Sequence, residues 1–284
     1  MKNISLSLIG KIDPKTVEVL RTVNAVLAEL EIAYVIVGAT ARDLVLHFGH
    51  GAKIQRATAD VDFAIQVSDW EAFNQLKDRL CEEGFETTDE LQRLYGPNKE
   101  PIDMVPFGGI EDKGANIAWP PKGDIAMSAL GFSEACQNAD KVLIADDPQT
   151  AVPVATPIGL MLLKLIAWTD RSPELRPKDA LDIKYLLTNY EEISIVKDQA
   201  YDQANSDLME SYDWDLTLAS SYILGVDVNN IAKDETRAVL TDLVQGQLSN
   251  LSVESLVDEM TQGNDLERKR NEQLIDAFYA GLSR

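Results

Sequence analysis

The 284-residue sequence has little cysteine, histidine and positive charge, and each shortage excludes a class of site or partner. Cys81 and Cys136 lie far apart without the spacing of metal ligands, which suits two free thiols in a reducing compartment. His47 and His50 are too few and too close together for a histidine-based catalytic metal site. These observations predict a cytoplasmic protein without disulfides or a zinc centre.

Long apolar runs and basic runs are also missing. The longest apolar stretch, residues 151–168, contains Pro153, Pro157 and Lys164, so no membrane span is expected. Residues 1–8 do not have the pattern of a signal peptide. The formal net charge of −21 makes non-specific binding to DNA unexpected, because such binding needs lysine and arginine at the phosphates. A local basic patch or a basic partner remains compatible with this charge.

The periodicity of apolar residues divides the chain into an α/β half and a helical half. Strand patterns over residues 33–37, 58–67, 85–95 and 101–107 alternate with helical patterns over 13–30, 41–48 and 70–84. Residues 108–123 are expected to be irregular, and 142–144 and 152–154 are short strand candidates. From Pro157 onward the patterns are helical, including one over 197–212. We therefore predict an α/β domain over residues 1–156 and a helical domain over 157–284.

Three aspartates are the most informative residues. Asp60 and Asp62 alternate along a predicted strand and so share one face, and Asp103 lies on another predicted strand. Three such carboxylates form an oxygen-rich site for a divalent ion such as Mg²⁺, with phosphate oxygens as further ligands. Asp213 and Asp215 repeat the spacing between helices, where caps or a solvated surface are the expected roles.

The segment Gly38-Ala39-Thr40-Ala41-Arg42 follows the first strand and opens a helix. A glycine lets the backbone approach a phosphate closely, and the N-terminus of a helix favours an anion. Two interpretations of Arg42 are open at this point: it binds phosphate, or it pairs with Asp43 or Asp69.

A second group of charges lies in the helical half. Lys164 interrupts an apolar helix and must reach water or a charged partner. Lys178 and Asp182 stand four residues apart on one helical face, and Asp179 and Asp182 three apart. The simplest interpretation is a snorkelling lysine beside a surface ion pair. The alternative is an anion site, since four cations gather here: Lys164, Arg171, Arg176 and Lys178.

In the order glycine turn, paired aspartates and third aspartate, residues 20–190 resemble the DNA-polymerase-β-like nucleotidyltransferase superfamily. The segment Lys164…Arg171…Lys178-Asp179-Ala-Leu-Asp182 is similar to nucleotidyltransferases of abortive-infection and toxin–antitoxin systems, of the AbiE effector type. The resemblance implies an α/β (α+β) fold: a minimal nucleotidyltransferase domain, with a mixed sheet flanked by helices, and an all-helical C-terminal domain.

The resemblance also implies a reaction. Asp60, Asp62 and Asp103 would be the catalytic and Mg²⁺- or Mn²⁺-binding residues, and Asp103 would activate the acceptor hydroxyl. The nucleotide-binding residues would be Gly38, Ala39, Thr40, Arg42, Lys164, Lys178, Asp179 and Asp182, with Ala39 replacing the family's usual Gly or Ser and Thr40 as a substitute for the lost hydroxyl.

The acceptor is left open by the sequence. A nucleoside monophosphate would move from an NTP to a hydroxyl of tRNA or protein, with release of pyrophosphate, and a cognate antitoxin would be a partner. A small-molecule acceptor, as in antibiotic nucleotidyltransferases, suits the acidic charge. RNA would need a basic track formed by Arg268-Lys269-Arg270, Lys53 and Arg56. The hypothesis from another class is a catalytically silent nucleotide-binding or interaction module.

Overall fold

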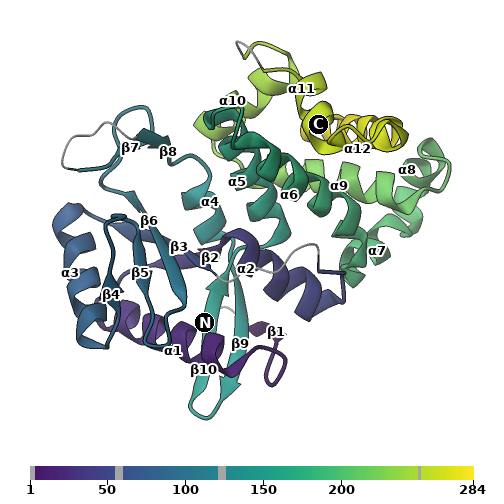
Figure 1. The fold of residues 1–284 in the computed structure, drawn as a ribbon. Helices are drawn as coiled ribbons and strands as arrows, with labels where there is room; N and C mark the ends of the chain where they lie inside the picture. The colour runs from purple at the N-terminus through teal and green to yellow at the C-terminus, as the bar shows by residue number, and fades with distance from the viewer. Residues whose placement is uncertain (1–3, 55–59, 121–125, 249–250) are drawn as a thin grey trace. The chain divides into compact units, whose positions relative to one another are not determined.

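The computed structural model describes residues 4–54, 60–120, 126–248 and 251–284 (Figure 1). The chain splits into two compact units: Met1–Gly49 with Lys53–Thr156, and His50–Ala52 with Pro157–Arg284. The first unit contains a mixed sheet with helices, and the second is helical. The predicted fold class is therefore confirmed.

An eight-stranded sheet forms the centre of the first unit, in the order β1-β9-β10-β2-β3-β6-β5-β4. Parallel pairs (β1 with β9, β10 with β2, β3 with β6) alternate with antiparallel pairs as far as β6, and the last two pairs, β6 with β5 and β5 with β4, are both antiparallel. The strands are β1 (Ile4–Ser7), β2 (Tyr34–Val37), β3 (Val61–Val67), β4 (Glu86–Thr87), β5 (Arg93–Tyr95), β6 (Pro101–Gly108), β9 (Asp140–Asp146) and β10 (Gln149–Val154).

The two long helices of this unit begin where the sequence supplies caps and bury apolar faces. In α1 (Pro14–Glu29), Asp13 accepts a hydrogen bond from the backbone N–H of Lys15, and Pro14 occupies the first helical position. Helix α3 (Trp70–Glu82) contacts α1 and β3, and Asp69 caps it by accepting from the N–H of Ala72. The short helices are α2 (Gly38–Arg42), the π-helix η1 (Asp43–Gly49) and α4 (Phe132–Gln137).

Several predicted elements differ in the structure. The strand expected over 85–95 is a hairpin of β4 and β5, because the Thr88 hydroxyl accepts from the N–H of Glu90 and donates to backbone carbonyls, which closes a turn. The segment expected to be irregular contains β7 (Asn116–Ala118), which pairs with β8 (Ala126–Ser128). The two short strand candidates extend into the β9–β10 hairpin.

The second unit packs its longest helices against one another. Helices α9 (Leu216–Ile231) and α12 (Asp265–Leu282) meet through glycines: a Cβ added to Gly225 would lie 2.0 Å from the carbonyl oxygen of Phe278, and one added to Gly281 would lie 2.0 Å from that of Tyr222. The helix expected over 197–212 is broken into α7 and α8 by a 3-10 turn. The other helices are α5 (Pro157–Asp170), α6 (Arg176–Asn189), α7 (Ser194–Ala200), α8 (Ser206–Ser211), α10 (Asp234–Val244) and α11 (Val253–Thr261), with 3-10 turns at Tyr190–Glu192 and Gln203–Asn205.

Candidate active site

The three aspartates converge on one face of the sheet. Asp60 directly precedes β3, Asp62 lies within β3, and Asp103 lies opposite Asp62 in the parallel register of β3 with β6. One carboxylate oxygen from each lies within 4.8 Å of the other two, and all three residues are half-buried. Among the described residues this is the group whose donors suit a metal ion. The donors are all carboxylate oxygens, which are the ligands that Mg²⁺ prefers.

Strand β3 begins at Val61, whereas the sequence predicts a strand from residue 58. Thr58 and Ala59, which the predicted strand included, lie outside the described residues. Asp60 is held in place from another element: the Thr40 hydroxyl donates a 2.7 Å hydrogen bond to the Asp60 backbone carbonyl. Thr40 is buried, so in this structure its hydroxyl fixes the backbone of the triad.

Gly38 brings the turn after β2 against Asp62. Its φ of +69° is in the left-handed region, and a Cβ at this position would lie 1.9 Å from Asp62 Oδ2. Only glycine fits there without moving the carboxylate. The sequence predicts a close approach of this backbone to a phosphate, and the structure has a close approach to a candidate metal ligand.

The other residues of the turn lie in two environments. Ala39 is half-buried at the start of α2. Arg42 is 2% exposed, and its Nε and Nη2 donate to Asp43 Oδ1 at 2.9 and 2.8 Å. Of the two interpretations of Arg42, the ion pair with Asp43 is the contact present in the structure.

Asp103 has a partner that the sequence does not reveal. Arg93 lies opposite Asp103 in the antiparallel pairing of β5 with β6. Its Nε donates to Asp103 Oδ1 and its Nη2 to Oδ2, each at 2.7 Å, so the guanidinium grips the carboxylate with two parallel hydrogen bonds. These bonds to Asp103 raise the pKa of Arg93 above its usual range.

In the helical unit, Lys164 is the centre of a buried ion-pair cluster. Its Nζ lies 3.0 Å from Asp179 Oδ1 and 2.7 Å from Asp182 Oδ2. Asp179 is fully buried and also pairs with Arg171 at 2.7 Å. Burial works to lower the pKa of Lys164, but the charges of Asp182 and Asp179 outweigh it and raise this pKa, so the ammonium stays charged at neutral pH.

The remaining cations of that segment differ from the expected arrangement. Lys178 is exposed, while Asp182, its expected partner four residues along the helix, pairs with Lys164 of α5. Arg176 Nε lies 3.4 Å from Glu259, and its guanidinium lies 5.4 Å from the centre of the Trp168 ring. Cations and carboxylates therefore alternate in this part of the helical unit.

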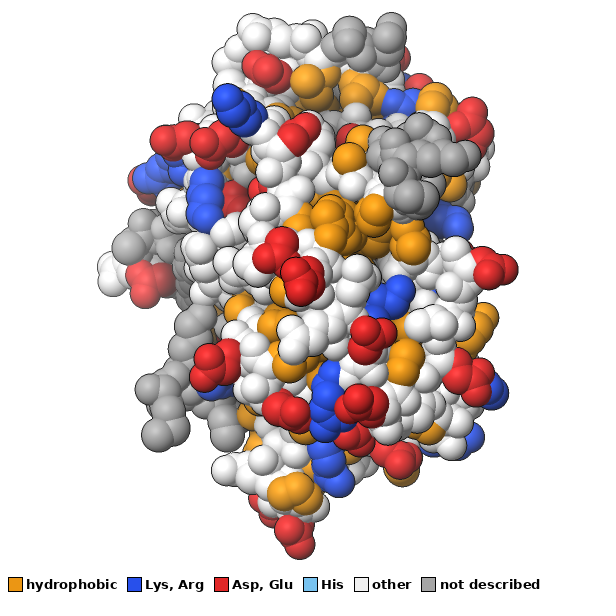
Figure 2. Space-filling view, turned by 90° about the vertical axis from the view of Figure 1, so that its left-hand side faces the viewer, with side chains coloured by type: hydrophobic (Ala, Val, Ile, Leu, Met, Phe, Trp, Pro, Cys, Tyr) orange, Lys and Arg blue, Asp and Glu red, His pale blue; other side chains and the backbone are white. Residues whose placement is uncertain are grey.

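The second pair of aspartates, Asp213 and Asp215, has the roles that the sequence predicts: Asp213 is exposed and Asp215 caps a helix. Asp215 caps α9 by accepting from the N–H of Leu218, and it binds Arg270 at 2.6 Å. Arg268 pairs with Glu272 and Asp258, so both arginines of the basic triplet already contact carboxylates. On the face drawn in Figure 2, Lys and Arg side chains are interspersed with Asp and Glu. Lys53 is exposed in its loop, and Arg56 lies outside the described residues.

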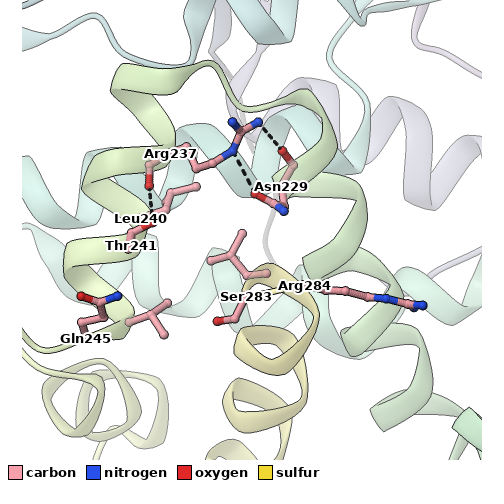
Figure 3. Close-up of a pocket in the computed structure, with 9 residues that line it drawn as sticks. Asn229, Arg237, Leu240, Thr241, Gln245, Ser283 and Arg284 are labelled. Carbon is pink, nitrogen blue, oxygen red and sulfur yellow. Dashed lines mark hydrogen bonds between the residues drawn. The ribbon is translucent and has the colours of Figure 1, made fainter.

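A cavity of about 290 Å³ lies in the helical unit, away from these clusters. Figure 3 shows Arg237 directed at Asn229, to which its Nε donates at 3.0 Å. Nη2 of Arg237 donates to the carbonyls of Asn229 and Ala232 at the end of α9, so this arginine satisfies the end of a helix. Because the hydrogen bonds of Arg237 serve the end of α9, we take the aspartate triad and not this cavity as the candidate catalytic site.

A family model for the nucleotidyl transferase AbiEii toxin of type IV toxin–antitoxin systems matches residues 19–262. The chain belongs to the AbiEii family. This AbiEii protein is thus a nucleotidyltransferase of the toxin–antitoxin class, as the motifs predict. The match includes all three aspartates and the Lys164 cluster.

Solved nucleotidyltransferase structures resemble this AbiEii chain at low identity. The antibiotic-resistance factor ANT(2'')-Ia is 14% identical, with a TM-score of 0.36, covering 71% of this chain and 99% of its own. An antigenic nucleotidyltransferase-like protein from Paracoccidioides brasiliensis is 18% identical, with a TM-score of 0.39, covering 72% and 91%. The Thermotoga maritima CCA-adding enzyme complexed with tRNA is 15% identical, with a TM-score of 0.27, covering 98% and 81%. Similarity at this level does not bear on the substrate.

No curated protein matches the sequence of this AbiEii chain. Within the described residues, no helix combines the length and hydrophobicity that a membrane crossing requires.

Proposed function

We propose that this AbiEii protein transfers a nucleoside monophosphate from an NTP to an acceptor hydroxyl and releases pyrophosphate. The observation that carries the proposal is the convergence of Asp60, Asp62 and Asp103 within 4.8 Å beside the Gly38 turn. The family match supports the class of reaction and an NTP as substrate.

Each residue has a proposed role. Asp60 and Asp62, together with Asp103, would hold Mg²⁺ (or Mn²⁺), which supplies charge neutralisation for the triphosphate and the departing pyrophosphate. The acceptor oxygen attacks the α-phosphorus, the bond between that phosphorus and the bridging oxygen to the β-phosphate breaks, and Asp103 takes the hydroxyl proton. Thr40 and Gly38 keep the carboxylates in position.

In the helical unit we assign the triphosphate contact to Lys164, whose charge is maintained by Asp179 and Asp182. Because Asp179 is fully buried between Lys164 and Arg171, its proposed role is to orient these cations rather than to contact the base. Lys178, which is exposed, remains a proposed nucleotide contact.

For the acceptor we propose a hydroxyl of tRNA or protein, with a cognate antitoxin as partner, in line with the type IV toxin–antitoxin family. The second candidate is a small molecule. It is favoured by the net charge of −21 and by the carboxylate partners of Arg268 and Arg270, which leave less positive charge for an RNA track.

The test is transfer of label from α-labelled NTPs, with Mg²⁺ and a cell extract, followed by separation of RNA, protein and small molecules. Asp60→Asn should lower incorporation at least about 100-fold, roughly 2.7 kcal/mol of transition-state stabilisation. The matched control is Asp213→Asn, which changes an exposed aspartate of the second D-x-D pair and should label like the native protein.

The same assay separates the proposed enzyme from a silent nucleotide-binding module. Titration calorimetry with each NTP and Mg²⁺ would accompany it, on the native protein and on Asp60→Asn and Asp62→Asn. Binding that survives both substitutions, together with no incorporation and no pyrophosphate from the native protein, contradicts the transferase proposal and supports the module.

A further inference from the structure

A row of charged side chains at the candidate site extends across three neighbouring strands. In register, Asp62 of β3 lies opposite Asp103 of β6, which lies opposite Arg93 of β5. The strand residues next to these positions are buried in the core, and Ile102 and Leu94 among them are fully buried. The three polar side chains therefore share the face that is not packed into the core.

We propose that Arg93 is a positioning residue that fixes the Asp103 carboxylate as a member of the metal-binding triad. This inference rests on the proposed function. Three carboxylates with oxygens within 4.8 Å of one another repel before a cation arrives, and a side chain under that repulsion turns toward solvent. The two 2.7 Å bonds from Arg93 oppose this motion, because they hold both oxygens of Asp103 at once.

The grip on Asp103 still permits metal binding. An ionised carboxylate has about four lone-pair positions on its two oxygens. The guanidinium occupies one position on each oxygen, so each oxygen keeps capacity for a metal ion or for the proton of an acceptor. The side chain of Arg93 is 28% exposed and that of Asp103 is 16% exposed, so water competes only partly with the pair.

The sequence contains a matched control. Arg79 forms the same kind of two-bond contact with Glu29, at 3.2 and 3.0 Å, and is 26% exposed, but it lies on α3 away from the triad. Arg79→Gln therefore removes a two-bond contact from an arginine of similar exposure, together with the pairs of Arg79 with Glu82 and Glu83; its partner Glu29 is more exposed than Asp103, 55% against 16%. Arg93→Gln removes the grip on Asp103, and Arg93→Lys keeps the charge without the planar two-bond contact.

The experiment measures Mn²⁺ binding by titration calorimetry without nucleotide, thermal unfolding, and kcat and KM for label transfer. Loss of a residue that orients a metal ligand typically costs 10- to 100-fold in metal affinity. Arg93→Gln should weaken Mn²⁺ binding by about that factor and lower kcat with little change in KM, while Arg79→Gln should bind Mn²⁺ like the native protein. Arg93→Lys should remain weaker than native.

Four results would overturn the inference. Equal Mn²⁺ affinity of Arg93→Gln and native protein, or no Mn²⁺ binding by the native protein, would reduce the contact to an ordinary strand-to-strand ion pair. Tighter binding by Arg93→Gln would mean that Arg93 competes with the metal for Asp103. Native affinity in Arg93→Lys would mean that charge alone matters. If Mn²⁺ binding follows the expectation but no acceptor is labelled, the proposed function fails while this inference stands.

Discussion

Replacing Gly38 by alanine should disable the site more than it destabilises the protein. The new Cβ would lie 1.9 Å from Asp62 Oδ2, so either the carboxylate or the turn must move by about 1 Å. A displacement of that size typically costs about 100-fold in rate, or roughly 2.7 kcal/mol of transition-state stabilisation. The positive φ adds a separate cost of about 1–2 kcal/mol to folding, because alanine disfavours the left-handed region.

The substitution Gly10→Ala is a control that separates the cost to folding from the cost to the site. Gly10 has nearly the same φ, +72° against +69°, and a Cβ there meets nothing within 4 Å. Gly10→Ala should therefore lose a similar amount of stability in urea denaturation while keeping native Mn²⁺ binding and label transfer. Gly38→Ala should lose both activities. If Gly38→Ala binds Mn²⁺ and transfers label as well as Gly10→Ala, the contact between the turn and Asp62 does not govern the site.

Two further perturbations test the charges of the helical unit. Lys164→Met leaves the carboxylates of Asp179 and Asp182 without their shared cation and should lower the free energy of unfolding by about 3 kcal/mol in urea denaturation at pH 7. Because the pKa of Lys164 is raised, this difference should persist up to the ordinary lysine pKa and shrink only as the pH rises beyond it; a difference that vanishes near pH 7 would contradict the assignment. Burial raises the pKa of Asp227 despite a hydrogen bond from Tyr190, so its stabilising contribution is present below the ordinary aspartate pKa and is lost as the pH rises through the folded-state value. Asp227→Asn should accordingly raise Tm at pH 7 more than at pH 4, and an equal shift at both would refute this reading.

The candidate site was predictable from sequence where local rules determine geometry. Alternation along a strand places Asp60 and Asp62 on one face, and a parallel pairing with the next buried strand brings Asp103 beside them. Capping is likewise one of the two roles that the sequence predicts for Asp215, and Asp215 caps α9. The alternation and the helix cap depend only on a residue's immediate neighbours, whereas the position of Asp103 also needs the pairing of β3 with β6.

The missed features depend on pairing between distant segments. The sequence predicts one long strand around Arg93, and the contact of Arg93 with Asp103 follows only from the β4–β5 turn and the β5–β6 register. Helical spacing puts Lys178 and Asp182 on one face, but Asp182 pairs at 2.7 Å with Lys164 of a different helix. Helical spacing identifies the face that a charge occupies, whereas the packing of two helices decides its partner.

The glycine crossing of α9 and α12 has a consequence for the time course of biosynthesis. Gly225 leaves the ribosome about 56 residues before Gly281, the residue that completes the crossing. At about 5–20 residues per second, α9 waits roughly 3 to 11 s for the helix that packs against it at Gly225. The sheet unit contains no residue beyond Thr156, so all three aspartates are synthesised before the helices α9 and α12.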